Sequence, residues 1–172
     1  MSGKIKMNDF DNFNKEVNNM LSDLKDPHLR TILTTKLALT LQNQIEDRFI
    51  EQNDFEGNAW VDRKKTKIPK NPRKKPVENK NLLLRKSGNL ADNWDNKSDA
   101  EGFVVFNNSK SSGGFPYGLV HAFGSKHVPK RSFLPLVEKN GSYDFNDKYK
   151  KCVMDEIYDF FDKELDKYKG KK

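Results

Sequence analysis

The feature that most constrains the fold is an apolar residue at every fourth position of residues 29–49. The members of this stripe are Leu29, Leu33, Leu37, Leu41, Ile45 and Phe49. Residues four apart lie on one side of an α-helix, and Asp26-Pro27 before the stripe is a typical helix start. We therefore expect one long helix that ends near Gln52-Asn53. Because a helix has 3.6 residues per turn, a spacing of four makes its buried face wind slowly.

Two further amphipathic helices are predicted, one before and one near the end of the chain. The first runs from about Asp9 to Leu24, where apolar residues recur at helical spacing. The last is marked by Tyr149, Val153, Ile157, Phe160, Phe161, Leu165 and Tyr168. On its exposed side, Asp159 and Lys163 have the i,i+4 spacing of an ion pair. We expect residues 169–172 to form a frayed tail.

Strand signals lie between these helices. Phe103–Phe106 is a short apolar run bounded by Gly and Asn, and the residues from Leu90 to Lys97 are expected to pair with it as a hairpin. Leu134–Glu138 predicts a further strand that ends before Gly141-Ser142. N-terminal helices including a long one, a small antiparallel sheet and a C-terminal helix predict an α+β class. We expect residues 1–172 to form a single domain.

The positive charge is concentrated in one segment. Eight basic residues without an acid lie in it: Arg63, Lys64, Lys65, Lys67, Lys70, Arg73, Lys74 and Lys75. The net charge of the chain is +7, so the rest is close to neutral (7 − 8 = −1). Because residues 62–80 contain several prolines and almost no apolar side chains, we expect a flexible basic loop.

Two roles are open for this basic loop. Its charges suit sequence-independent, salt-sensitive contact with DNA phosphates. The aromatic side chains that stack on single-stranded bases are missing between Val61 and Lys80. Lysine-rich loops are also often only solvated, or they contact acidic surfaces of partner proteins. Contact with DNA and contact with protein therefore both remain hypotheses.

The residues that could carry chemistry form no recognisable catalytic set. His121 and His127 with Cys152 have no usual zinc spacing, and Cys152 adjoins Val153 on an apolar helix face. We expect His121 to be a structural, hydrogen-bonded side chain and Cys152 to be an inert buried thiol. Residues 111–114 are followed by Phe-Pro, unlike a phosphate-binding loop. The sequence therefore predicts no enzyme, no cofactor and no metal.

Composition sets the expected environment. No apolar run approaches the roughly 18 residues of a membrane span, and the N-terminal residues lack the apolar core of a secretory signal. We expect a soluble protein that is made in a cytoplasm. Apolar residues are 34% and charged residues 33% of the chain, so the core must be small. Neighbours in an assembly are expected to add stability.

The passage from Phe115 to Leu136 is dense in aromatic, His, Pro and Gly residues. A short apolar turn leads to Ala122-Phe123-Gly124. A basic segment then connects Gly124 to Arg131. We expect Phe123, Phe133 and Leu134 to be buried apolar anchors.

These residues resemble the phage virion morphogenesis family, which includes Mu-like and P2-like tail completion or neck proteins. The resembling motifs are Phe55–Trp60, Leu84–Leu90 with Gly88, Tyr117-Gly118, His121-Ala122-Phe123-Gly124, and Val128-Pro129-Lys130-Arg131-Ser132-Phe133-Leu134. They occur in the family's order over about residues 29–136. Two positions depart from the family pattern: Ala122, where members often have Gln, and Ser132, where Pro is usual.

The resemblance implies a structural virion protein of a tailed phage or prophage. Such a protein completes the tail or the head–tail junction, commonly as a ring of identical subunits, with tail or connector proteins as partners. It implies a location in the virion after synthesis in the bacterial host cytoplasm. Trp60, Gly88, Tyr117, His121, Gly124 and the Arg131–Leu134 anchor would be structural. The alternative is a small DNA-binding protein that uses residues 63–75.

Overall fold

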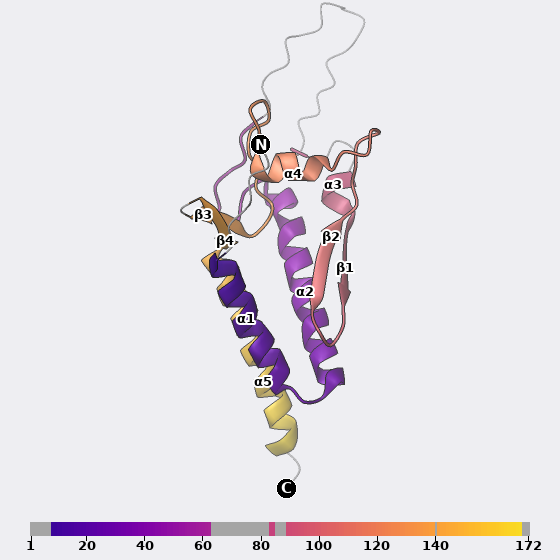
Figure 1. The fold of residues 1–172 in the computed structure, drawn as a ribbon, viewed down its shortest axis with the longest axis vertical. Coiled ribbons are helices and arrows are strands. Elements are labelled where there is room, and N and C mark those ends of the chain that lie inside the picture. The colour runs from indigo at the N-terminus through magenta and orange to yellow at the C-terminus, as the bar shows by residue number, and fades with distance from the viewer. Residues whose placement is uncertain (1–7, 63–82, 85–88, 140, 170–172) are drawn as a thin grey trace, which may run out of the picture.

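The computed structural model describes residues 8–62, 83–84, 89–139 and 141–169 (Figure 1). Five helices and four strands lie in these ranges: α1 (Asn8–Asp23), α2 (Pro27–Glu51), α3 (Asn89–Asp92), β1 (Trp94–Ser98), β2 (Phe103–Asn107), α4 (Tyr117–Phe123), β3 (Leu136–Lys139), β4 (Ser142–Phe145) and α5 (Asp147–Lys169). The predictions for the basic residues 63–75, for Gly88 and for residues 170–172 lie outside the described residues.

The long helix α2 begins and ends as its sequence indicates. The Asp26 carboxylate accepts a hydrogen bond from the His28 backbone N–H at 2.8 Å, and this N-cap satisfies a donor that the first helical turn leaves free. At the other end Gln52 has a left-handed backbone (φ 58°), and its N–H donates to the Arg48 carbonyl at 2.9 Å. The predicted limits of this helix are confirmed.

The buried face of α2 winds as expected, and it therefore serves two cores. Each step of four residues turns the face by about 40°, so the four steps from Leu33 to Phe49 turn it by about 160°. Leu33 and Leu37 belong to one buried cluster, whereas Ile45 and Phe49 belong to another. Leu41, between them, packs against both clusters.

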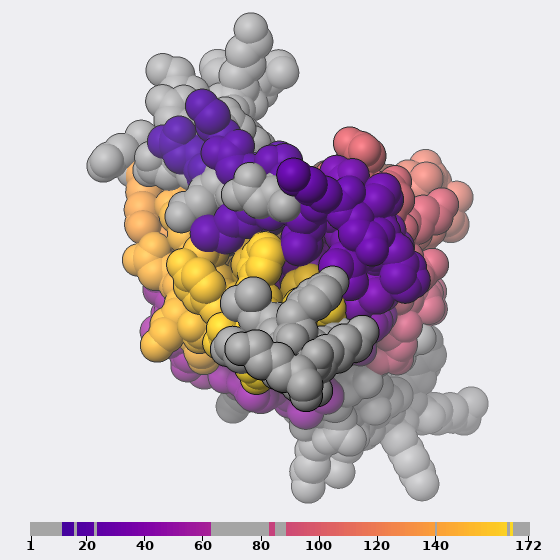
Figure 2. All heavy atoms as spheres, turned by 90° about the horizontal axis from the view of Figure 1, so that it is seen from below, coloured from indigo at the N-terminus to yellow at the C-terminus, as the bar shows by residue number. Residues whose placement is uncertain are grey.

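The first core joins α1 and α5 to the N-terminal half of α2. Figure 2 shows α1 in indigo and α5 in yellow side by side in a view from below. The α1 side of this core is made of Phe13, Val17 and Leu21, together with Leu24, which follows the helix; Tyr149, Val153, Ile157 and Phe160 form the α5 side. On the surface, Lys36 of α2 pairs with Glu156 and Asp159 of α5 at 2.5 and 2.9 Å. The predicted pair of Asp159 and Lys163 is present at 2.8 Å.

The hairpin of β1 and β2 lies against α2 and is held by polar contacts as well as by apolar packing. The Thr34 hydroxyl, fully buried, donates to the Asp99 carbonyl in the hairpin turn at 2.7 Å. The Thr35 and Ser98 hydroxyls are 2.7 Å apart, and Asn96 Nδ2 donates to the Gln42 amide oxygen at 2.7 Å. The predicted hairpin is present, with Trp94 opposite Asn107 and Ser98 opposite Phe103. The expected start of its first strand at Leu90 is wrong, because residues 90–92 lie in the short helix α3.

The second hairpin corrects one prediction. β3 ends before Gly141-Ser142 as predicted, but the chain then turns at Gly141 into β4, a strand that was not predicted and that pairs with β3. Gly141 has φ +75°, a conformation that glycine adopts without strain. Phe145 of β4 contacts the rings of Phe13 and Tyr149 at centroid distances of 5.7 and 5.0 Å, so burial favours the added strand. The predicted α+β class is confirmed, with two small antiparallel sheets.

We expect truncation of a buried α2 side chain to cost far more than truncation of an exposed one. Leu37 is 1% exposed and Leu39, two residues on, is 47% exposed. Leu37→Ala should lower the free energy of unfolding by about 2–5 kcal/mol because it leaves a cavity. Leu39→Ala should change it by less than about 0.5 kcal/mol. Urea unfolding followed by circular dichroism measures both, and equal losses would contradict this placement of α2.

Candidate functional site

The passage singled out from the sequence lies across the C-terminal end of α2 (Figure 1). It contains the short helix α4, which follows Pro116 and stops at Gly124. The Gly124 N–H donates to the Val120 carbonyl at 2.8 Å and so closes the last turn. The backbone of Gly124 has φ 78° and ψ 174°, a region that is essentially restricted to glycine. Glycine here lets the chain leave the helix sharply.

The chain then returns along α4. The Arg131 N–H donates to the His121 carbonyl at 2.8 Å. The return passes so close to Gly124 that a Cβ atom there would lie 3.0 Å from the Lys130 backbone nitrogen. We refer to residues 117–134, α4 with its returning segment, as the clasp.

Two buried polar side chains attach the clasp to the segment after α2. Arg131 is 6% exposed, and its Nε and Nη2 donate to the carbonyls of Val61 and Asp62 at 2.9 and 3.4 Å. In the opposite direction the Trp60 indole Nε1 donates to the Ser132 carbonyl at 3.0 Å. Buried polar groups of this kind are stable only when they are paired. Arg131 and Trp60 therefore hold two segments that are distant in sequence.

Phe133 is the apolar centre of the clasp. It is 2% exposed and its ring lies 5.0 Å from the ring of Phe49 and 5.8 Å from that of Trp94. The Trp60 ring meets Phe49 edge-on at 5.4 Å. Gly118 of α4 packs against this group, because a Cβ there would be 3.9 Å from the Phe133 ring. Aromatic contacts at these distances add stability beyond area burial.

The structure brings together most of the residues predicted as a structural motif. Trp60, Gly124, Arg131 and Phe133 interact directly or through neighbouring backbone, as described above. Phe123 and Leu134, predicted as buried anchors, are only half-buried; the Phe123 ring contacts Tyr143 of β4 at 4.9 Å. Phe49 and Trp94 were not predicted to belong to this site. The place of Phe49 as the last apolar residue of the α2 stripe indicates that it is buried at the C-terminal end of that helix.

His121 is half-buried in the clasp. Its ring meets Tyr117 edge-on at 6.4 Å. Burial lowers the pKa of His121 from its ordinary value, and the positive charge of Arg131 lowers it further. Within the described part of the chain its buried Nδ1 atom has no hydrogen-bond partner. The hydrogen bond predicted for this side chain is therefore not found at that nitrogen.

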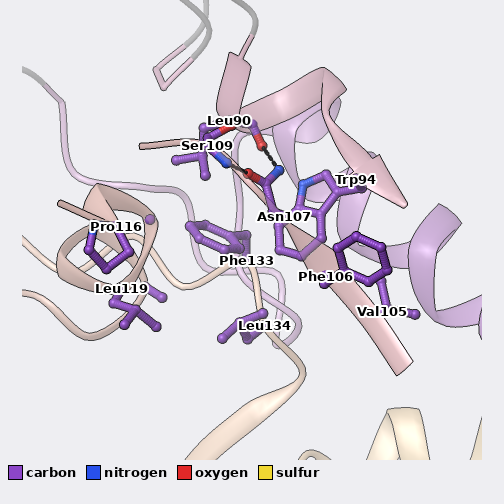
Figure 3. A pocket seen from close by; sticks show the side chains of 12 residues that line it. Leu90, Trp94, Val105, Phe106, Asn107, Ser109, Pro116, Leu119, Phe133 and Leu134 are labelled. Atoms are coloured by element: carbon purple, nitrogen blue, oxygen red, sulfur yellow. Dashed lines mark hydrogen bonds between the residues drawn. The ribbon is translucent and has the colours of Figure 1, made fainter. Parts of the chain in front are cut away.

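An apolar pocket of about 220 Å³ opens between the clasp and β2 (Figure 3). Phe133 and Leu134 line it on one side, Leu119 of α4 on another, and Trp94 and Val105 on the hairpin side. Two of its polar side chains bond to backbone: Asn107 Nδ2 donates to the Leu90 carbonyl at 3.1 Å, and the Ser109 hydroxyl to the Asn89 carbonyl at 2.5 Å. The buried indole Nε1 of Trp94 has no hydrogen-bond partner among the described residues. The pocket suits an apolar side chain better than a polar substrate.

The candidate metal-binding and nucleophilic side chains, His, Cys, Asp and Glu, form no cluster of three that could hold a metal among the described residues. Cys152 is half-buried, less than predicted, and accepts a hydrogen bond from Gln44 Nε2 at 2.9 Å. Burial raises the pKa of its thiol, which disfavours the reactive thiolate. The helices within the described ranges include none long and apolar enough to cross a membrane.

Comparison with known proteins identifies one family. The sequence model of the phage virion morphogenesis family matches residues 11–143, well over half of the chain. This range contains α2, the hairpin of β1 and β2, and the whole clasp. No curated protein and no solved structure matches the chain.

Gly124→Ala should destabilise the protein more than Gly141→Ala. Both glycines have positive φ, +78° and +75°, but only the Gly124 side is crowded, since nothing lies within 4 Å of a Cβ at Gly141. We expect a loss of about 2–4 kcal/mol at Gly124 and of about 1 kcal/mol at Gly141. Urea midpoints measure the difference. Equal losses of stability in the two variants would show that the close approach of the Lys130 backbone to Gly124 does not restrict the side chain at that position.

The clasp should weaken at low pH through His121. Because its pKa is lower in the folded than in the unfolded protein, the unfolded chain binds this proton more readily. The stability from neutral His121 is present above the unfolded pKa of about 6.5 and is lost as pH falls toward the folded value. The urea midpoint at about pH 5 relative to about pH 7.5 should fall less in His121→Gln than in wild type.

The exposed His127 provides the control for this experiment. His127→Gln should retain the pH dependence of the wild type. An identical pH dependence of the urea midpoint in wild type and His121→Gln would show that His121 does not contribute to the loss of stability in acid.

Proposed function

Because this chain belongs to the phage virion morphogenesis family, a structural role in building the phage particle is supported, and we propose that it completes the tail or the head–tail junction. The particle is that of a tailed phage or a prophage, and the chain acts there as a ring of identical subunits. Its partners are tail or connector proteins. It is made in the cytoplasm of the bacterial host and remains in the virion.

The observation that carries this proposal is the family match across α2 and the clasp. Within that range Arg131 and Trp60 donate hydrogen bonds to backbone carbonyls, and the Phe133 ring packs against other aromatic rings. The family suggests a structural rather than a catalytic role.

Large apolar side chains on the surface agree with a part that acts in an assembly. Phe115, Leu119 and Tyr158 are each more than half exposed, at 54%, 55% and 56%. Exposed apolar patches often mark protein–protein contacts. Neighbouring subunits or tail proteins would cover these side chains in the particle.

The basic residues from Arg63 to Lys75 are proposed as a secondary contact. In a head–tail junction they would meet DNA phosphates or an acidic surface of a neighbour. A small DNA-binding protein that uses this segment as its main surface is the alternative function. Its support is the charge of the segment itself, eight basic residues without an acid.

The proposed function is tested with phage that lack this chain. We expect cells infected by such phage to accumulate separate heads and tails, or unfinished tails, in electron micrographs. Supplying the wild-type chain from a plasmid should restore infectious particles by several orders of magnitude. Complete, infectious particles without the chain would contradict the proposal.

A second variant in the same test separates the two roles of the basic segment. Replacing all eight basic residues between Arg63 and Lys75 by Gln removes the charge. Particle formation with this variant, together with loss of salt-sensitive duplex binding, would favour DNA contact as a dispensable property. Loss of duplex binding in this variant, together with complete infectious particles in phage that lack the chain, would favour the alternative.

A further inference from the structure

The end of the molecule at α4 combines exposed apolar side chains with positive charge. Phe115 and Leu119 are 54% and 55% exposed, and Leu119 also lines the pocket of Figure 3. From Gly102 to Val137 the sequence contains no Asp or Glu. An exposed apolar surface with lysines nearby in the chain is typical of a site for a protein partner that carries carboxylates, although Lys130 also lines a second pocket with Asp54, Glu56 and Glu138.

Three lysines supply the charge. Lys110 precedes Phe115 in the loop after β2, and Lys126 and Lys130 follow α4; all three are exposed. None of them forms an ion pair with another residue that the structure describes. We refer to Phe115, Leu119 and these lysines as the α4 surface.

The outer side of α5 carries an exposed aromatic ring with two carboxylates, and Lys151 also lies on this face, since it lines a pocket with Asp155. Tyr158 is 56% exposed, and Asp155 and Asp162 precede and follow it by three and four residues. Residues at this spacing share one face of a helix. Both aspartates are exposed, and within the described ranges neither forms an ion pair. We refer to Tyr158, Asp155 and Asp162 as the α5 surface.

The neighbouring carboxylate of Asp159 does not share this role. It is paired with Lys36 and Lys163 at 2.9 and 2.8 Å, and these hydrogen bonds lower its pKa, that to Lys163 first. The negative charge available to a partner on this side of α5 therefore rests on Asp155 and Asp162.

The two surfaces belong to separate parts of the molecule. In Figure 1, α4 lies at one end of the longest axis, whereas α5 runs toward the other end. Contact between the surfaces therefore joins different copies. Such a head-to-tail contact uses unlike patches, and its repetition closes a ring when the rotation between copies allows it.

We propose that the α4 surface of one copy binds the α5 surface of a second copy. Tyr158 of the second copy packs on Phe115 and Leu119, beside the pocket, and its two aspartates face the lysines of the first. This contact is the interface of the ring and so rests on the proposed function. Phosphate groups of DNA would match the lysines but would leave the apolar side chains in water, which favours a protein occupant.

Charge reversal on either side tests the interface. Lys126→Glu/Lys130→Glu and Asp155→Lys/Asp162→Lys should each raise the concentration needed for assembly at least tenfold, measured by light scattering over a concentration series. A mixture of the two variants should recover assembly, because each keeps one intact surface and the reversed surfaces attract each other. Placing all four substitutions in one chain should recover it as well.

The controls carry the same charge changes elsewhere on the surface. Lys15→Glu/Lys25→Glu and Asp47→Lys/Asp95→Lys alter exposed residues outside both surfaces and should assemble like wild type. Circular dichroism establishes that each variant is folded.

Several results would overturn the interface. These are unchanged assembly of either reversed variant, no recovery in the mixture, or a wild-type chain that stays monomeric throughout the concentration series. Loss of duplex DNA binding in Lys126→Glu/Lys130→Glu, with assembly unchanged, would reassign the α4 surface to phosphate.

The particle test separates failure of the interface from failure of the function. If wild type and the reversed variants restore particles equally well, the interface is wrong and the proposed function stands. If particles form without the chain, the proposed function fails whatever the scattering shows. Restoration by wild type and by the four-substitution chain, but by neither reversed variant alone, supports both.

Discussion

The structure depends on the burial of one helix along a face that rotates. Four-residue spacing of the apolar side chains turns the buried face of α2 by about 160° between Leu33 and Phe49. The N-terminal half of α2 is thereby directed to α1 and α5, and the C-terminal half to α3 and the clasp. A helix whose apolar residues recur every 3.6 positions on average would bury a straight face against one core. Here two small cores pack on the same helix, and Leu41 contacts both.

The clasp is built on the second of these cores, and two of its hydrogen bonds to distant segments involve buried Arg131 and Trp60. The guanidinium of Arg131 binds the carbonyls of Val61 and Asp62, and the indole of Trp60 binds that of Ser132. These bonds join two segments some 70 residues apart, next to Phe133 in the chain. Such an arrangement fixes the two segments relative to each other, which agrees with a family that builds virions.

A rigid body of this kind leaves the remaining apolar and charged side chains for contacts between molecules. Exposed lysines precede and follow the exposed residues of α4 in the chain, whereas Asp155 and Asp162 flank Tyr158 on α5. A small core provides little stability by itself. Neighbouring subunits that cover these surfaces would add stability that the isolated chain lacks. In the proposed ring these surfaces form the contacts between copies.

The sequence by itself determined the long helix with its Asp26 cap, the first hairpin, the α+β class and the family, because these follow from local spacing, turn residues and motif order. It did not reveal β4, whose few residues are selected by the contact of Phe145 with Phe13 and Tyr149. Nor did it reveal the partners of Arg131 and Trp60. Those partners are backbone carbonyls, and a carbonyl has the same chemistry at every residue. Only the tertiary structure decides which of them a side chain meets.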